Sequence, residues 1–288
     1  MHFTRISRLA SKGASQMRAW QVQSPGESLQ LKTVSMPILT KPNQVLIKVK
    51  AASVNPVDTV MVKGYGREIL GVWKKVADCD SNASRFPLIA GRDCSGVVEA
   101  IGGGVKGLRP GDEVCALFHR SYTIRRMRGV QVMAVVPAIW PGSHAEYVVT
   151  EESCCSTKPK NLDFTQAAAM PYVANTAWAA LVSVARMNPH KKPAERVLIH
   201  GGSGGLGTMA IQMLKAWGVD KVVVTCSNES AETVRKLGAI PVDYRAADVR
   251  DQLINEGPFE VILDCVDTEL ARWSDQVRRI GQLRKTRA

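Results

Sequence analysis

Residues 202–207 carry the strongest chemical signal in the sequence. They read Gly-Ser-Gly-Gly-Leu-Gly, which has the spacing G-x-G-x-x-G. Glycines at such positions let the chain turn tightly and bring backbone N–H groups close to a bound diphosphate. The competing interpretation is a turn that needs glycine only to pack a helix against a strand.

The residues around this loop favour the diphosphate interpretation. A short apolar strand is predicted over 196–200, directly before the glycines. Apolar side chains then recur with helical spacing over 206–217, and Gly218 can end that helix. A helix that begins at the loop offers free N–H groups and a partial positive charge to an anion. The sequence therefore predicts a dinucleotide site in this loop.

The end of the next predicted strand, 221–226, indicates which dinucleotide binds. Folds that bind NAD usually place an acidic residue about 20 residues past the loop, where it accepts the ribose 2′-OH. Here that position is Ser227, and the first carboxylate is Glu229. A small hydroxyl leaves room for a 2′-phosphate, so NADPH is predicted over NADH. Three nearby cations could add positive charge or simply be solvated; they are Arg235, Lys236 and Arg245.

Two kinds of secondary structure must position these residues. Residues 17–160 are β-rich, with strands predicted over 45–50, 96–102 and 145–149 and turn signals between them. An alanine-rich helical stretch, 166–187, follows and is interrupted by Pro171. After it, strands are predicted over 196–200, 221–226, 241–242 and 259–264, and helices over 206–217, 230–237 and 247–255. This order predicts an α/β chain in which a β-rich domain precedes a doubly wound parallel sheet.

The formal net charge of +12 is concentrated in three segments. Residues 1–18 and 117–134 each carry a net +4, and residues 271–288 carry +5, so the remainder is close to neutral. A nucleic-acid binder would need a basic face on the folded body. That class is therefore not expected.

The N-terminus and the cysteines point to a compartment. The first acidic residue is Glu27, and the basic, serine-bearing residues before it are typical of a mitochondrial transit peptide, which is predicted over 1–16. Seven dispersed cysteines include no C-x-x-C pair, so neither a disulfide framework nor a structural zinc site is expected. No apolar run is long enough for a membrane-spanning helix.

Several short motifs together resemble the zinc-independent medium-chain dehydrogenase/reductases, in their quinone-oxidoreductase branch. The motifs are Ala52–Asp58, Gly64–Gly66, Pro87–Asp93, Gly96–Val98, Gly111–Val114, Ala145–Tyr147 and Leu237–Ala239. Their order and spacing extend over about residues 30–270.

This resemblance implies a GroES-like β domain followed by a Rossmann domain, with NADPH in the cleft between them. It implies that Ser203, Gly205, Leu206 and Ser227 contact the cofactor. Tyr244 would lie near the adenosine 2′-phosphate and Thr176 near the nicotinamide. The resulting set of cofactor residues is Thr176, Gly202, Ser203, Gly204, Gly205, Leu206, Gly207, Ser227 and Tyr244.

The resemblance also implies where chemistry occurs. Asn55 corresponds to the family residue beside the substrate. A quinone can take its proton from water, whereas an enone would need a donor, for which Tyr65 is the candidate; Tyr65 is equally a packed turn aromatic. Zinc-dependent relatives carry Gly-His-Glu where this chain has Gly91-Arg92-Asp93, so no metal is expected. Cys94 is interpreted as packing.

Two segments depart from the family pattern. Residues 117–134 read as an insert in a surface loop, and the basic tail 271–288 does not read as a fifth strand. The Rossmann domain, expected over 161–270, would then be truncated at its C-terminus, with the strand at 259–264 as a bare apolar edge and the family's homodimer edge lost. We therefore expect this chain to be poorly stable and weakly active or inactive.

Two functions remain open at this stage. The first is hydride transfer from NADPH to a quinone or related α,β-unsaturated carbonyl. The alternative is a non-catalytic mitochondrial interaction protein that keeps the fold, and the resemblance leaves room for a membrane-protein partner.

Overall fold

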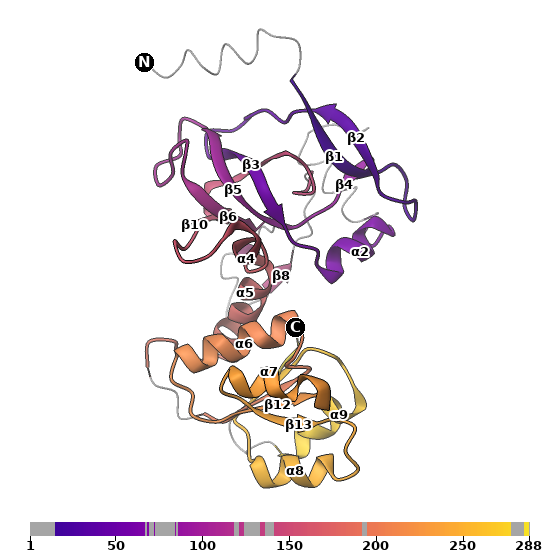
Figure 1. The fold of residues 1–288 in the computed structure, drawn as a ribbon, viewed down its shortest axis with the longest axis vertical. Helices are drawn as coiled ribbons and strands as arrows, with labels where there is room; N and C mark the ends of the chain where they lie inside the picture. Colours follow the sequence, from indigo (N-terminus) through magenta and orange to yellow (C-terminus); the bar gives the residue numbers. More distant parts are fainter. Residues whose placement is uncertain are drawn as a thin grey trace. The chain divides into compact units, whose positions relative to one another are not determined.

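The computed structural model describes residues 15–66, 86–117, 141–191 and 195–277, with short pieces at 68, 72, 84, 121–123, 133–135 and 285–287. The chain divides into two compact units, Met1–Tyr172 and Val173–Ala288 (Figure 1). Each unit is considered by itself. Residues 1–14 of the predicted transit segment lie outside the described residues.

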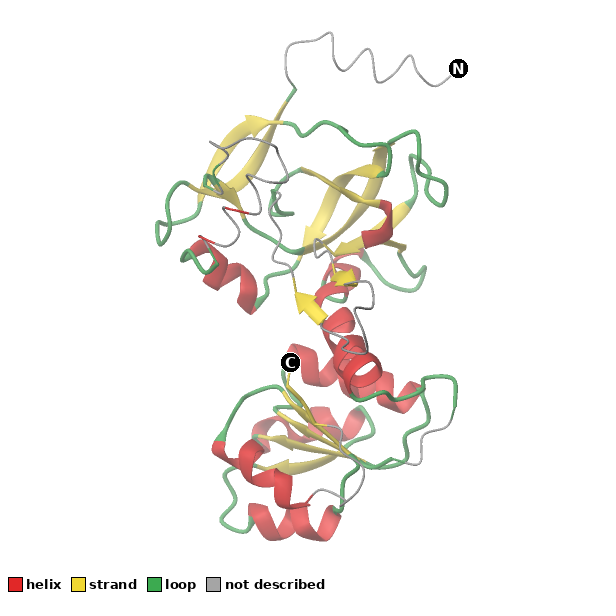
Figure 2. Cartoon of the chain, turned by 180° about the vertical axis from the view of Figure 1, so that it is seen from behind, coloured by secondary structure: helices red, strands yellow, loops and turns green. Residues whose placement is uncertain are grey.

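The first unit is built on strands, as its composition predicted. Its strands are β1 (Gln16–Val22), β2 (Gln30–Ser35), β3 (Gln44–Ala52), β4 (Leu88–Ile89), β5 (Asp93–Ile101), β6 (Glu113–Leu117), β7 (Ser121–Thr123), β8 (Met133–Val135), β9 (Tyr147–Glu151) and β10 (Cys155–Thr157). They form a three-stranded sheet in the order β2-β1-β4, a five-stranded sheet in the order β10-β6-β5-β3-β9, and the pair β7-β8. The described part of this unit also contains two short helices, α2 (Pro56–Val62) and α4 (Phe164–Ala168), and a 3-10 turn at Glu152–Cys154 (Figure 2).

The larger sheet of this unit covers an apolar core. Alternate residues of β3 point inward, so Val45 and Ile47 are fully buried and pack with Val98 and Val114. Gln44 and Leu46, which point to the other face, are buried as well, so both faces of β3 are covered over these residues. The sheet thus supplies a rigid platform at the ends of β3 and β5, where the candidate substrate residues lie.

The first unit ends later than residue 160, the predicted domain boundary. Helix α4 packs against β3 and β5, and the Ser95 hydroxyl donates to the Phe164 carbonyl. Lys158 also places its ammonium 5.3 Å from the Phe164 ring centroid. These contacts attach the residues up to Tyr172 to the β-rich unit.

The second unit contains the parallel sheet. Its strands are β11 (Val197–His200), β12 (Val222–Cys226), β13 (Ile240–Asp243), β14 (Val261–Asp264) and β15 (Lys285–Arg287), in the order β13-β12-β11-β14-β15. Its helices are α5 (Pro171–Trp178, which begins in the first unit), a π-helix (Ala179–Val184), α6 (Gly205–Ala216), α7 (Ala231–Lys236), α8 (Val249–Glu256) and α9 (Glu269–Trp273), with 3-10 turns at Asn228–Ser230 and Ser274–Val277. This is the 3-2-1-4-5 order of a doubly wound sheet.

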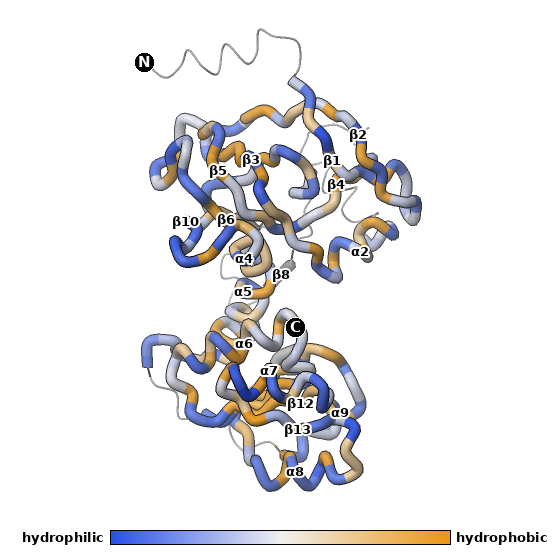
Figure 3. The backbone as a smooth tube through the Cα atoms, in the orientation of Figure 1, coloured by the Kyte–Doolittle hydropathy of each residue, from blue (hydrophilic) through white to orange (hydrophobic). Residues whose placement is uncertain are grey.

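Both faces of this sheet are covered by helices. Ile199 and Val224 face the core formed with Leu214 of α6 and Val234 of α7. Leu198, on the opposite face, belongs to a second core. The other members of that core include Val223, Leu253 of α8, Phe259, Ile262 and Trp273 of α9. The central strands β11, β12 and β14 are therefore buried along their whole length. The trace around β12 is correspondingly hydrophobic (Figure 3).

The helical stretch predicted over 166–187 is three helices rather than one interrupted helix. Helix α4 ends at Ala168, and Pro171 opens α5, because proline is tolerated where a helix begins. Residues 179–184 then wind as a π-helix, in which the Ala185 N–H donates to the Ala180 carbonyl at 2.9 Å. The alanine-rich composition gave no signal for this wider turn.

The expectation that the basic tail cannot supply a fifth strand is wrong. Strand β15 pairs in parallel with β14 and aligns Lys285 with Ile262 and Arg287 with Asp264. Pairing of a strand needs only backbone N–H and C=O groups, and charged residues are normal on a short edge strand. The apolar strand β14 is therefore not a bare edge. The folded core also continues past residue 271, since Ala271 and Val277 are buried.

The predicted insert 117–134 is described only in part. The antiparallel pair β7-β8, which aligns Ser121 with Val135, is the described portion near it, and the rest lies outside the described residues. No helix within the described part of the chain is both long and apolar enough to cross a membrane.

Candidate functional site

The glycine loop connects β11 to α6 in the second unit. Gly201, with a φ of +73°, makes the turn, and the N–H groups of Gly201 and Gly202 both donate to the Thr225 carbonyl at 3.1 Å. A Cβ on Gly202 would overlap Val224, and one on Gly207 would overlap the backbone of Gly202. These glycines are needed by the packing of the chain itself. The interpretation of the loop as a packing turn is therefore correct for part of the motif.

The two central glycines have a different environment. The protein atoms nearest to a Cβ built on Gly204 and Gly205 are the Gly201 carbonyl oxygen at 3.5 Å and Val173 Cγ1 at 3.8 Å. Helix α6 begins at Gly205, and Ser203–Gly205 are exposed. The chain leaves an open space against the backbone at the first turn of a twelve-residue helix. A diphosphate fits there, because N–H groups and the helix dipole favour an anion in contact with the backbone.

Ser227 and Tyr244 are brought together at the carboxyl edge of the sheet. The last residues of β12 and β13, Cys226 and Asp243, are aligned, and the Tyr244 N–H donates to the Cys226 carbonyl at 3.2 Å. The Arg245 guanidinium lies 5.1 Å from the Tyr244 ring centroid. A hydroxyl, an aromatic ring and a cation therefore meet beside the strand that carries the glycine loop.

Thr176 lies on α5, whose residue Val173 is the nearest neighbour of Gly205. Thr176 is three residues further along, on the same helical face as Val173. Helix α5 is anchored by Trp178, which meets Trp217 edge to face with ring centroids 5.9 Å apart. The predicted cofactor residues thus all belong to the second unit and surround one edge of its sheet.

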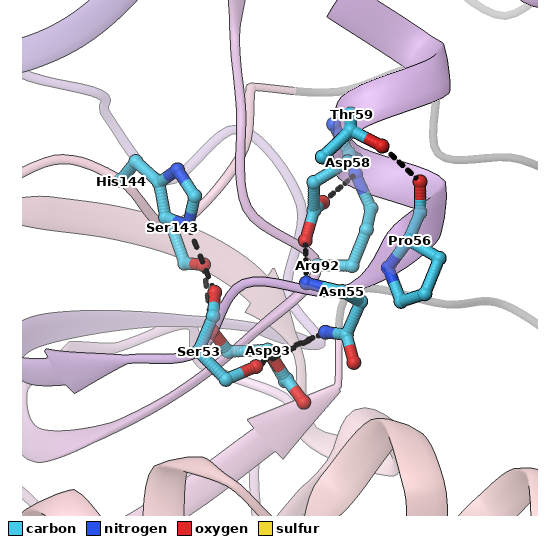
Figure 4. A network of polar contacts seen from close by, with 9 residues as sticks. All are labelled: Ser53, Asn55, Pro56, Asp58, Thr59, Arg92, Asp93, Ser143 and His144. Atoms are coloured by element: carbon cyan, nitrogen blue, oxygen red, sulfur yellow. Dashed lines mark hydrogen bonds and ion pairs between the residues drawn. The ribbon is translucent and has the colours of Figure 1, made fainter. Parts of the chain in front are cut away.

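Asn55 belongs to a polar network in the first unit (Figure 4). Its side-chain amide donates to Ser53 Oγ at 3.0 Å and to Asp93 Oδ1 at 3.1 Å. The Ser53 hydroxyl also donates to Asp93 Oδ1, and the Tyr172 N–H donates to Asp93 Oδ2 at 3.1 Å. Asn55 is buried and directly precedes α2, so its side chain is held in one orientation.

Burial raises the pKa of the Asp93 carboxyl above its ordinary value, although hydrogen bonds from Ser53, Tyr172 and Asn55 oppose the shift. The charge of Asp58 contributes to the raised pKa of Asp93 as well. Burial likewise raises the pKa of the Tyr172 hydroxyl. The network is therefore a desolvated acidic centre in which donors converge on one carboxylate.

A buried ion pair supports this centre. Arg92 Nε lies 3.7 Å from Asp58 Oδ1, with side chains 2% and 3% exposed. Asp58 Oδ2 accepts the Asn55 N–H at 2.8 Å, which fixes the start of α2. Where zinc-dependent relatives would carry a histidine, this chain holds the guanidinium of Arg92, which does not ligate a cation.

Tyr65 lies outside the network drawn in Figure 4. Its side chain is 64% exposed, in the turn after α2 between Gly64 and Gly66, whose φ values are +97° and +68°. Its N–H donates to the Val60 carbonyl at 2.9 Å. Tyr65 is thus on the surface of the first unit, and its role as a proton donor stays a prediction.

Several residues of the network were not predicted from the sequence. Ser143 Oγ donates to the Asp93 carbonyl at 2.7 Å, and His144 Nε2 lies 2.9 Å from the Ser53 carbonyl. Nothing in the spacing of Ser143 and His144 indicates this contact. Asp58 could have been found, because an acid three residues after Asn55 has the spacing of a helix capping box. Among the described residues, no group of three or more His, Cys, Asp or Glu side chains is arranged to hold a metal ion.

Family models match both units. The alcohol dehydrogenase GroES-like domain matches residues 41–160, and the zinc-binding dehydrogenase domain matches residues 205–278. The two-domain fold predicted from the sequence, a GroES-like domain followed by a Rossmann-type sheet, is thereby confirmed. The second match also runs beyond residue 270, where the resemblance was expected to end.

Relatives and a solved structure agree with these matches. The chain is 54% identical over 272 residues to "Reticulon-4-interacting protein 1, mitochondrial" of Caenorhabditis elegans, covering 94% of this chain and 69% of that protein. It is 41% identical over 262 residues to the human "NAD(P)H oxidoreductase RTN4IP1, mitochondrial", covering 90% of this chain and 61% of that protein. The quinone oxidoreductase from Coxiella burnetii superposes with a TM-score of 0.68 at 29% identity, over 92% of this chain and 73% of that one.

The chain therefore spans less than two thirds of the length of the human relative and slightly more than two thirds of the length of the nematode relative. Both are named mitochondrial, which confirms the predicted mitochondrial localisation. Family models match both units, and 54% of the aligned residues are identical to those of the nematode protein. These two findings establish the family of the chain. The chain belongs to the medium-chain dehydrogenase/reductase family.

Proposed function

We propose that this chain is an NADPH-dependent oxidoreductase that transfers hydride to a quinone or a related α,β-unsaturated carbonyl without a metal. The open space at Gly204 and Gly205, at the first turn of α6, carries the proposal. A hydroxyl residue rather than a carboxylate at the end of β12, Ser227, supports NADPH. The names of the human and Coxiella proteins support the reductase class and the quinone.

Each candidate residue then has a task. NADPH supplies the hydride when bound, so the chain only has to position and shield the reactants. The loop Gly202–Gly207 binds the diphosphate through the N–H groups of the first turn of α6. Ser227 and Tyr244 bind the 2′-phosphate, and Thr176 contacts the nicotinamide end. In the first unit, Asn55 orients the substrate carbonyl.

The proton follows a different route for the two substrate classes. A quinone that accepts hydride takes its proton from water, so no dedicated acid is needed. An enone needs a donor at the adjacent carbon, and Tyr65 is the candidate for that step. Substitution of Tyr65 by Phe should therefore lower the turnover of enones and leave that of quinones unchanged.

The test is NADPH oxidation by the purified chain with a panel of quinones and enones. The double variant Gly204→Ala, Gly205→Ala should abolish NADPH binding, because its two methyl groups fill the space that the diphosphate would occupy. The matched control is Gly103→Ala, since Gly103 lies in an exposed turn with nothing within 4 Å of an added Cβ. Unchanged NADPH binding by the double variant would overturn the proposal.

The same assay tests the expectation of low activity. That expectation assumed an uncovered β14, and β15 pairs with this strand in the structure. We therefore expect measurable turnover.

The name of the nematode relative favours one competing function, a non-catalytic interaction protein. A chain that binds NADPH but oxidises it with no quinone or enone would favour this function. Capture of a mitochondrial membrane protein that persists in the Gly204 and Gly205 double variant would support it further.

A further inference from the structure

A carboxylate already occupies the donors at the carboxyl edge of β12 and β13. Arg245 Nη1 lies 3.3 Å from Glu229 Oε1. The nearby Ser227 hydroxyl, the Glu229 backbone N–H and the charge of Arg245 hold the pKa of this carboxyl below its usual range. Ser227 Oγ also lies 3.4 Å from Ser230 Oγ. Glu229 is therefore anionic at neutral pH and sits between a hydroxyl and a guanidinium.

The backbone fixes where this arrangement lies. Asp243 Oδ1 accepts the Arg245 N–H at 2.9 Å, and the Arg245 side chain extends over the Tyr244 ring at 5.1 Å. The Ser230 N–H donates to the Ser227 carbonyl at 3.0 Å and closes the turn that carries Glu229. These contacts place Ser227, Glu229, Tyr244 and Arg245 at one point on the edge of the sheet.

The donors that hold Glu229 are those that a phosphate monoester would use. A guanidinium binds carboxylate and phosphate in the same way, through parallel N–H groups. Arg245 and Glu229 are 58% and 73% exposed, and an exposed ion pair is weak enough to exchange partners. The other cations nearby, Arg235 and Lys236, pair with Glu232 on α7 instead.

We propose that Glu229 and Arg245 are the pair that sets the preference between NADPH and NADH, and that Glu229 takes the place of the 2′-phosphate in the ligand-free chain. When NADPH binds, its 2′-phosphate replaces the Glu229 carboxylate at Arg245 and Ser227. When NADH binds, Glu229, two residues past Ser227 in the turn Asn228–Ser230, stays and accepts a hydrogen bond from the ribose 2′-OH. It then takes the role that an acidic residue at the strand end has in folds that bind NAD. The inference rests on the proposed function, because it concerns the same dinucleotide site.

The pair therefore acts in opposite directions on the two cofactors. Glu229 opposes NADPH, since its charge must move away from the phosphate, and it favours NADH. Arg245 favours NADPH and has no charged partner on NADH. The chain should consequently bind both cofactors, with a preference that one substitution can shift in either direction.

The experiment measures dissociation constants of NADPH, NADH, 2′,5′-ADP and 5′-AMP with the purified chain. Glu229→Gln should raise the ratio of NADPH to NADH affinity about fivefold, which corresponds to about 1 kcal/mol for a charge removed next to a phosphate. Arg245→Gln should lower that ratio about tenfold, the size of one charge-assisted hydrogen bond. The ratio of 2′,5′-ADP to 5′-AMP affinity should move in parallel, because these probes lack the nicotinamide.

Two variants control for net charge. Glu232→Gln and Arg235→Gln make the same charge changes on α7, and each should alter the ratios less than twofold. If Glu232→Gln shifts the ratios as much as Glu229→Gln, the effect is general electrostatics and the inference is wrong. If NADPH binds but Glu229→Gln leaves both ratios unchanged, the inference fails alone. If neither cofactor binds to the unmodified chain, the proposed function fails with it.

Discussion

The change Gly207→Ala tests whether the chain's own packing shapes the glycine loop. An added Cβ would overlap the Cα of Gly202 and lie 2.7 Å from the Gly201 carbonyl oxygen. Both neighbours are backbone atoms, which cannot rotate away as a flexible side chain would. Overpacking of this kind costs about 3 kcal/mol, while alanine in a helix interior gains about 1 kcal/mol over glycine. We therefore expect the free energy of unfolding to fall by about 2 kcal/mol.

Thermal unfolding of the purified chain measures this loss. For a unit of about 100 residues, each kcal/mol shifts the midpoint by about 4 °C, so Gly207→Ala should lower the Tm of the second unit by about 8 °C. Gly103→Ala lies in the first unit with open space around it, and it should leave both transitions in place. A Gly207→Ala chain that unfolds at the same temperature as this control would refute the reasoning.

Further predictions concern binding, pH, thiols and the core. Gly205→Ala should change the unfolding free energy by less than about 0.5 kcal/mol and still lower NADPH affinity. This result would show that Gly205 leaves room for the ligand, whereas Gly207 is needed for packing. Equal losses in stability for Gly205→Ala and Gly207→Ala would contradict this. Burial raises the pKa of Asp93 in the folded chain, so the folded state binds more protons and stability falls as pH rises from about 4 through that pKa. Urea unfolding from pH 4 to 7 should show this slope in the unmodified chain, and Asp93→Asn should remove it. Burial also raises the pKa of Cys155 and Cys265 to about 12, so both thiols should react with iodoacetamide at pH 8 roughly a thousandfold more slowly than a free thiol, as peptide mapping after timed quenching would show. Phe259→Ala, at a fully buried site, should cost about 4 kcal/mol in guanidinium unfolding, and a loss below 1 kcal/mol would place Phe259 outside the core.

The Rossmann-type unit was predictable from the sequence because its signals are local. A buried strand, a glycine loop and a helix with one apolar face follow one another over 196–217, and the structure has β11 and α6 within two residues of those bounds. Counting from the loop also placed Ser227 at the end of the next strand, since the length of a strand-helix-strand unit fixes where that strand ends, and β12 ends at Cys226. The local sequence pattern was thus sufficient to predict the structure wherever residues close in sequence are also close in space.

The Asn55 network was less predictable because its members come from distant parts of the chain. Ser53 and Asp93 are 40 residues apart, and His144 is 91 residues from Ser53. Side-chain contacts over such separations depend on how the sheet pairs, which no spacing rule encodes. Strand β15 was missed for a related reason: two of its three residues are charged, and only the neighbouring backbone of β14 makes them a strand.

The π-helix over 179–184 affects whether the chain can lose a residue without losing its fold. A turn closed by a hydrogen bond from residue i+5 contains one residue more than an ordinary helical turn, as the bond between Ala185 and Ala180 shows. Deleting one residue within this stretch should therefore convert the π-helix into an ordinary α-helix, with the residues before and after it facing the same way as now. Residues 179–184 should consequently tolerate a single-codon deletion that the buried strand β11 would not.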